Sequence, residues 1–130
     1  MTTPEELADV RRLVREFGAE RVRPRIRDLE EAGTFPRELY REMGQLGFFG
    51  CIFPEDLGGT GLGFRALAIV AEELAYAYPP LSACMNLQAA TVPLTIQRWG
   101  TPEVVERYVP GLVGGELIGY NAMSEPDGGT

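Results

Sequence analysis

The stretch Tyr120-Asn121-Ala122-Met123-Ser124-Glu125-Pro126-Asp127-Gly128-Gly129-Thr130 decides how this chain is divided. A short apolar run is followed by a hydroxyl, an acid, a proline and two glycines, which is typical of a strand that leads into a loop. Almost every earlier segment has helical periodicity. We therefore predict an all-α domain over residues 1–115 and a strand with a loop over residues 116–130. The loop either approaches a ligand closely or is an ordinary turn.

Composition excludes several classes of protein. The chain has 130 residues, 45% hydrophobic and 24% charged, which is typical of one globular domain. Its 19 acidic and 12 basic residues give a net charge of -7, which argues against nucleic acid or an anionic membrane as a partner. It shows no leader pattern and no apolar run of roughly 18 residues, so we expect a cytoplasmic protein without a membrane span.

The reactive residue types are few. The chain contains no histidine, which removes the commonest general base and the commonest metal ligand. Cys51 and Cys84 lack metal or redox spacing, so we expect two packed thiols and no metal site. The acid pairs Glu5-Glu6, Glu30-Glu31 and Glu72-Glu73 are interpreted as solvated helix surface, with no catalytic residue among them.

Caps and breakers set the expected helices. Helices are expected from Thr3-Pro4 to Gly33 with a kink or break at Pro24, from Pro36 to Gly47, from Phe64 to Tyr78, from Leu81 to Trp99 with an interruption at Pro93, and from Thr101-Pro102 to Arg107 or Tyr108, before Pro110. Glu116 to Met123 is the first expected strand. The glycine-rich segment 47–63 lacks the spacing of a phosphate loop, and we expect it to serve close backbone packing.

The segment Leu81 to Val92 carries no charge. A helix that is uncharged all round is either core or the lining of a cavity. Ser82, Asn86 and Gln88 need polar partners if they are buried, whereas Met85 and Ala89 could line a pocket for a long apolar ligand. The residues alone leave both alternatives open.

Five motifs occur in an order that resembles the N-terminal helical domain of the acyl-CoA dehydrogenase family of flavoproteins. They are Leu46-Gly47-Phe48-Phe49-Gly50 with Pro54-Glu55-Asp56-Leu57-Gly58-Gly59-Thr60-Gly61-Leu62-Gly63, Val70-Ala71-Glu72-Glu73-Leu74-Ala75, Trp99-Gly100-Thr101-Pro102, Tyr108-Val109-Pro110-Gly111-Leu112, and Ala122-Met123-Ser124-Glu125-Pro126-Asp127-Gly128-Gly129-Thr130. The resemblance covers essentially the whole chain. It implies that residues 1–115 are the family's helical-bundle domain and that residues 116–130 begin its middle β-domain.

The resemblance also implies site residues. Members hold FAD, and the flavin-contacting positions correspond to Asn121, Met123, Ser124, Gly129 and Thr130. The acyl cavity corresponds to the uncharged helix, with Ser82, Met85, Asn86 and Ala89 toward the ligand and Thr130 near the thioester. The family's catalytic base lies in the C-terminal part of its members and has no counterpart here.

Departures from the family pattern bear on the substrate. Asn121 stands where many members have a larger residue, and Ser124 and Thr130 exchange one hydroxyl residue for another. Met85-x-x-Gln88 is similar to the glutaryl-CoA branch. That branch uses an arginine for the distal carboxylate where Ser82 stands here, so we expect a cyclic, branched or medium acyl group instead.

The expected function is α,β-dehydrogenation of an acyl-CoA by an FAD-dependent enzyme of which this chain is an inactive part. Electron-transfer flavoprotein or another acceptor and a homotetramer are the partners that the resemblance implies. The alternatives are an acyl-CoA oxidase or reductase of the same fold and a non-catalytic helical interaction module.

Overall fold

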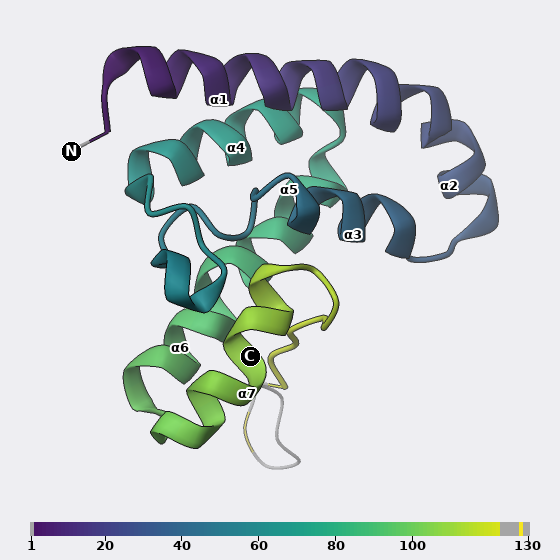
Figure 1. Ribbon diagram of the computed structural model, residues 1–130. Coiled ribbons are helices and arrows are strands. Elements are labelled where there is room, and N and C mark those ends of the chain that lie inside the picture. Colours follow the sequence, from purple (N-terminus) through teal and green to yellow (C-terminus); the bar gives the residue numbers. More distant parts are fainter. Residues whose placement is uncertain (1, 123–127, 129–130) are drawn as a thin grey trace.

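The computed structural model describes residues 2–122 and Gly128 (Figure 1). This part of the chain is built from seven α-helices, so the predicted all-α fold class is confirmed. The elements are α1 Pro4–Phe17, η1 Gly18–Val22, η2 Arg23–Arg25, α2 Ile26–Ala32, α3 Arg37–Gln45, η3 Glu55–Leu57, α4 Gly63–Ala77, α5 Pro79–Asn86, η4 Leu87–Thr91, α6 Val92–Trp99 and α7 Pro102–Val113. Of these, η1 and η4 are single π-helical turns, and η2 and η3 are 3-10 turns.

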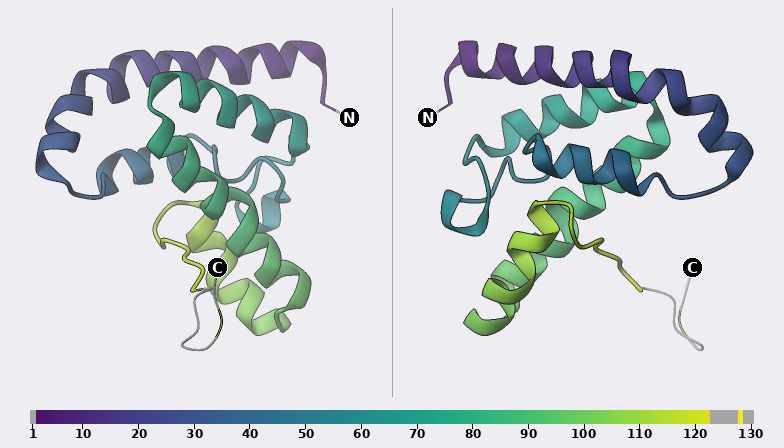
Figure 2. Two further views of the ribbon diagram at one scale, coloured as in Figure 1. Left: turned by 180° about the vertical axis from the view of Figure 1, so that it is seen from behind. Right: turned by 45° about the vertical axis from the view of Figure 1, so that its right-hand side comes forward.

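The helices form two groups (Figures 1 and 2). At one end α1 lies along α4, and α3 packs beside them. From α4 the chain turns into α5, η4 and α6, which follow one another as a single rod away from α1, and α7 folds back against α6. The rod therefore belongs to both groups, and its sides face different neighbours.

Local capping explains where helices begin and end. In the predicted capping box of α1, the Glu6 amide donates to Thr3 Oγ1 at 3.2 Å and the Thr3 amide donates to Glu6 Oε2 at 2.6 Å. Gly33 and Gly47 take positive φ angles of 58° and 78° after α2 and α3. Glycine adopts this left-handed conformation without a Cβ clash, so both predicted helix ends are confirmed.

Pro24 and Pro93 both lie in a helical path that continues past them, and both are accommodated by the same local geometry. Each lies just after a π-helical turn, in which Arg23 N–H donates to Gly18 O and Val92 N–H donates to Leu87 O. The wider turn moves the carbonyls that a proline ring would otherwise strike, so the helical path continues with a change of direction. The predicted kink and interruption are therefore π-helical turns.

Pro110 departs from the prediction. The last helix was expected to stop before this residue, but α7 continues through it to Val113. Pro110 is exposed, and continuation of the helix buries Val109, Leu112 and Val113. Burying three apolar side chains at about 1.5 kcal/mol or more each outweighs the roughly 3 kcal/mol that an internal proline costs.

The predicted strand from Glu116 to Met123 is not paired over the described residues. Residues 114–117 form turns, and residues 118–122 have neither helical nor strand structure. A strand requires a neighbour to which its backbone bonds, and the described chain provides none for residues 118–122. Met123 lies outside the described residues.

Two apolar clusters hold the fold together. The main cluster joins α1, α3, α4 and α5 to the segment after α3, with Phe17 and Phe48 in an edge-to-face contact at 5.4 Å between ring centroids. A smaller cluster places Phe53 against Val109 and Val113 of α7. The apolar part of segment 47–63 thus connects the two groups of helices.

The glycines of this segment serve close packing, as predicted. A Cβ on Gly59 would stand 2.0 Å from Phe53 O, and one on Gly50 would stand 3.0 Å from Gly59 Cα. Backbone hydrogen bonds close the loop, from Thr60 N–H to Gly50 O at 3.0 Å and from Gly61 N–H to Phe53 O at 2.9 Å. Side chains at Gly50 and Gly59 would prevent this approach.

Candidate ligand-facing region

The uncharged helix supplies both core and surface. Ser82, Met85 and Ala89 are buried, with exposed fractions of 7%, 0% and 0%. Ser82 Oγ donates to Ala71 O of α4 at 2.8 Å, so its hydroxyl is engaged within the bundle. Asn86, in contrast, is exposed. The structure therefore brings three of the four predicted acyl-facing residues into the core and leaves only Asn86 on an open face.

The exposed side of this rod consists of other residues. Ala83, Asn86 and Leu87 are exposed there, and Leu87 is 40% accessible. One turn further on, a hollow is lined by Ala90, Thr91, Leu94, Thr95, Arg98 and Trp99. This surface is predominantly apolar or neutral, with Arg98 its one charged member among these residues. It can contact an apolar ligand or another domain.

Gln88, which the sequence marks only as a polar group that needs partners if buried, has its partners at the end of α7 and in the segment after it. Its side chain is fully buried in η4. Gln88 Nε2 donates to Leu112 O at 2.6 Å and to Leu117 O at 2.7 Å, while Gln88 Oε1 accepts from Gly119 N–H at 2.8 Å. The signal in the sequence was a long amide within an uncharged helix, which needs partners when buried. Those partners lie 24 to 31 residues away along the chain, so the sequence does not identify them.

The predicted flavin-contacting residues follow directly after this segment. Asn121 is half-buried, and Tyr120 beside it is 79% exposed. We find no hydrogen bond from the backbone of residues 120–122 to another described residue. Tyr120 and Ala122 are exposed, so their side chains are open to contact with a ligand or another domain. Met123, Ser124, Gly129 and Thr130 lie outside the described residues.

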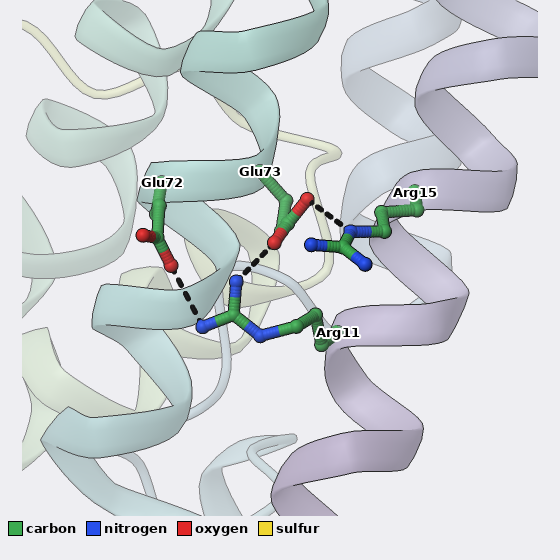
Figure 3. A network of polar contacts seen from close by, with 4 residues as sticks. All are labelled: Arg11, Arg15, Glu72 and Glu73. Atoms are coloured by element: carbon green, nitrogen blue, oxygen red, sulfur yellow. Dashed lines mark hydrogen bonds and ion pairs between the residues drawn. The ribbon is translucent and has the colours of Figure 1, made fainter.

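Glu73 is not the solvated acid that was predicted for the Glu72-Glu73 pair. It is 4% exposed and lies between two arginines of α1 (Figure 3). Arg15 Nε donates to Glu73 Oε2 at 2.7 Å, and Arg11 pairs with Glu73 and, at 2.7 Å, with Glu72. The prediction was wrong for Glu73 because helical position does not reveal that α1 covers this side of α4. Glu72 is half-exposed, as predicted.

The electrostatics of Glu73 make it a structural group. The Arg15 hydrogen bond, supported by Arg11, holds the pKa of the Glu73 carboxyl below its ordinary value. A carboxylate with a lowered pKa and two guanidinium partners is a poor proton acceptor near neutral pH. This ion-pair network joins α1 to α4 and offers no acid-base chemistry.

The remaining reactive groups are also structural. Cys51 is a buried free thiol and Cys84 a partly buried one, in line with the expectation of two packed thiols. Burial raises the pKa of the Cys51 thiol to about 11. Among the described residues no cluster of side chains has the composition of a metal site, and no helix has the length and apolarity to cross a bilayer.

Comparisons with known proteins agree with this architecture. Residues 4–116 match the family model of the acyl-CoA dehydrogenase N-terminal domain. The benzylmalonyl-CoA dehydrogenase of Aromatoleum aromaticum is 33% identical over 96% of this chain and 34% of its own length. The chain superimposes with a TM-score of 0.91 and 33% identity on a glutaryl-CoA dehydrogenase solved with glutaryl-CoA, over 99% of this chain and 33% of that one. An acyl-CoA dehydrogenase from Bacillus anthracis, solved with FAD, gives a TM-score of 0.88 at 28% identity over 99% of this chain and 23% of that one.

The chain belongs to the acyl-CoA dehydrogenase family, with its N-terminal domain over residues 4–116. It spans about a third of the length of the benzylmalonyl-CoA dehydrogenase that it matches.

Proposed function

We propose that the whole protein is an FAD-dependent acyl-CoA dehydrogenase that introduces a double bond between the α and β carbons of an acyl-CoA thioester. The observation that supports this most is the family match over residues 4–116, together with the similarity in fold to enzymes solved with an acyl-CoA and with FAD. When bound, the flavin supplies the acceptor for the hydride. The 130 residues supply structure around the reaction and no catalytic residue.

In this proposal the closing loop contacts the cofactor. Met123 and Ser124 would face the pyrimidine edge of the flavin, and Asn121 would lie beside it. Gly129 would allow close approach to the pyrophosphate, and Thr130 would donate a hydrogen bond to an anionic oxygen near the thioester. The half-buried position of Asn121 and the exposure of Tyr120 and Ala122 are compatible with this arrangement.

The acyl-facing wall is proposed on the rod formed by α5, η4 and α6. Ser82, Met85 and Ala89 would support the wall from within, since they are buried. Asn86 would face the ligand together with the exposed Ala83 and Leu87. No residue from Pro79 to Thr91 is charged. A distal carboxylate would therefore find no counter-charge on this part of the rod, which favours a cyclic, branched or medium acyl group over a dicarboxylic one.

The test uses the whole protein with its flavin. The expected result is a flavin absorbance spectrum that bleaches anaerobically when a branched, cyclic or medium-chain acyl-CoA is added, with weaker bleaching by glutaryl-CoA. Reduction of an electron-transfer flavoprotein or an artificial acceptor, without oxygen consumption, would separate a dehydrogenase from an oxidase. A whole protein that binds no FAD would contradict the proposal and favour a helical interaction module. Light scattering would test the proposed homotetramer.

A further inference from the structure

The segment Leu81 to Val92 carries no charge but contains a buried amide, that of Gln88. Gln88 is fully buried, and both nitrogen-bound hydrogens of its amide are engaged, at 2.6 Å by Leu112 O and at 2.7 Å by Leu117 O. Its oxygen accepts from Gly119 N–H at 2.8 Å and lies 3.4 Å from Tyr40 Oη. A buried amide is costly unless its donors and acceptors are satisfied, whereas a methionine would fill the space without that requirement. The groups that bond to this amide therefore indicate what Gln88 does in the fold.

Most of these contacts reach a single short piece of chain. The end of α7 and the segment that follows it supply three of the four partners of Gln88, which span residues 112 to 119. Glu116 N–H and Leu117 N–H also donate to Gly111 O, each at 2.9 Å. The segment is thus fixed at both of its ends, by Gly111 and by Gln88.

Gly119 is constrained from a second side. A Cβ at this position would stand 2.9 Å from Val92 Cβ, at the start of α6. The backbone therefore lies directly on the rod, and its amide points into the rod at Gln88. One residue further on, Tyr120 is 79% exposed. Gly119 is the last point at which the described chain is held by the helical domain before Asn121.

We propose that Gln88 is a positioning residue that fixes the point from which the closing loop extends toward the flavin. This inference rests on the proposed function, because it assigns the loop after Gly119 to the cofactor. Gln88 touches neither cofactor nor substrate. It sets the position of Gly119 through one hydrogen bond and that of Leu117 through another, and the residues from Asn121 onward begin at that fixed position.

The experiment compares Gln88→Met with Tyr40→Phe in the whole protein. Gln88→Met keeps the side-chain length and removes the three bonds to residues 112–119. Tyr40→Phe is the matched control, since it removes the 3.4 Å contact and the 3.1 Å bond from Tyr40 Oη to Cys84 O but leaves those three bonds intact. We expect the Kd for FAD to rise about tenfold in Gln88→Met, since the net loss of one or two hydrogen bonds changes an equilibrium by about that factor. Tyr40→Phe is expected to lower the Tm without changing the Kd.

Hydrogen–deuterium exchange provides a readout that does not depend on the flavin. In Gln88→Met, peptides over residues 115–122 should exchange about tenfold faster while those of α1 stay unchanged. Gly119→Ala tests the same point without altering the core, should Gln88→Met fail to fold, and should also weaken FAD binding. Unchanged FAD affinity and unchanged exchange over residues 115–122 in the folded variants would overturn the inference. A wild-type protein that binds no FAD would refute the proposed function instead, while the exchange comparison would still decide whether Gln88 holds the segment.

Discussion

Glu73 shows how a single side chain joins two helices. Its carboxylate is nearly inaccessible, but its partners Arg11 and Arg15 are 34% and 64% exposed, so solvent screens the ion pairs. We expect Glu73→Gln to lower the free energy of unfolding by about 1–2 kcal/mol, because solvent screening reduces the roughly 1.5–3 kcal/mol typical of hydrogen bonds to charged groups. Urea denaturation near neutral pH measures this. The control Glu72→Gln removes a half-exposed partner of Arg11 and should change stability by no more than about 0.5 kcal/mol. Equal losses in both variants would contradict the assignment of Glu73.

The same carboxyl predicts a pH dependence. Arg15 and, less strongly, Arg11 lower the pKa of Glu73 from its ordinary value of 4.5. The unfolded chain therefore takes up this proton first as the pH falls, so the stabilisation is complete above about pH 4.5 and is lost as the pH falls through the lower pKa of the folded state. Stability measured at a series of pH values should fall more steeply for the wild type than for Glu73→Gln. Parallel curves would show that the ion pair does not contribute.

At the scale of the element, the close packing of α3 on the end of α7 requires a glycine at position 44. Alanine is favoured over glycine in a helix by about 1 kcal/mol, so propensity predicts that Gly44→Ala stabilises α3. A Cβ on Gly44 would stand 2.2 Å from Gly114 O, however, and a backbone atom cannot yield as a flexible side chain can. We therefore expect a loss of at least about 2 kcal/mol, in the range of overpacked cores. Thermal unfolding should show this loss.

Gly111→Ala is the control for that measurement. Its added Cβ would meet Leu117 Cδ1 at 2.9 Å and Cγ at 3.0 Å, and the side chain of Leu117, which is 42% exposed, can rotate away. Its effect should therefore be close to zero. A stabilised Gly44→Ala protein would show that α3 does not pack as closely on the end of α7 as the structure indicates.

Helix ends were predictable from the sequence because their causes are local. Thr3 with Glu6, and Gly33, act on backbone groups within one turn of themselves. The behaviour of the prolines was not predictable, since it depends on neighbours. The π-helical turns before Pro24 and Pro93 keep their helices packed, and α7 continues through Pro110 because Val109, Leu112 and Val113 gain burial.

At the scale of the whole molecule, the candidate site also has features that local sequence patterns predicted and features that depend on distant neighbours. The absence of charge from Leu81 to Val92 indicated that this helical segment is core or lines a cavity, but not which of its sides faces the core. Ser82, Met85 and Ala89 pack inward while Asn86 faces outward, and Gln88 bonds to a segment 24 to 31 residues further along the chain. These arrangements depend on how α4, α7 and the closing segment surround the rod, which no local pattern in the sequence encodes.

The surroundings of the acidic groups predict how the 130-residue chain behaves by itself. Proton abstraction next to a thioester needs a carboxylate with an accessible lone pair and a pKa near the working pH. Two arginines hold Glu73 and lower its pKa, and Arg21 lowers the pKa of Glu42 in the same way. In the proposed function, the base is supplied by a part of the whole protein other than these 130 residues. We therefore expect no dehydrogenation above the buffer rate when the purified chain is mixed with FAD, an acyl-CoA and an artificial acceptor, whereas the whole protein turns over under the same conditions. Turnover by the chain alone would require a base within its 130 residues and would contradict the assignment of this domain to structure and positioning.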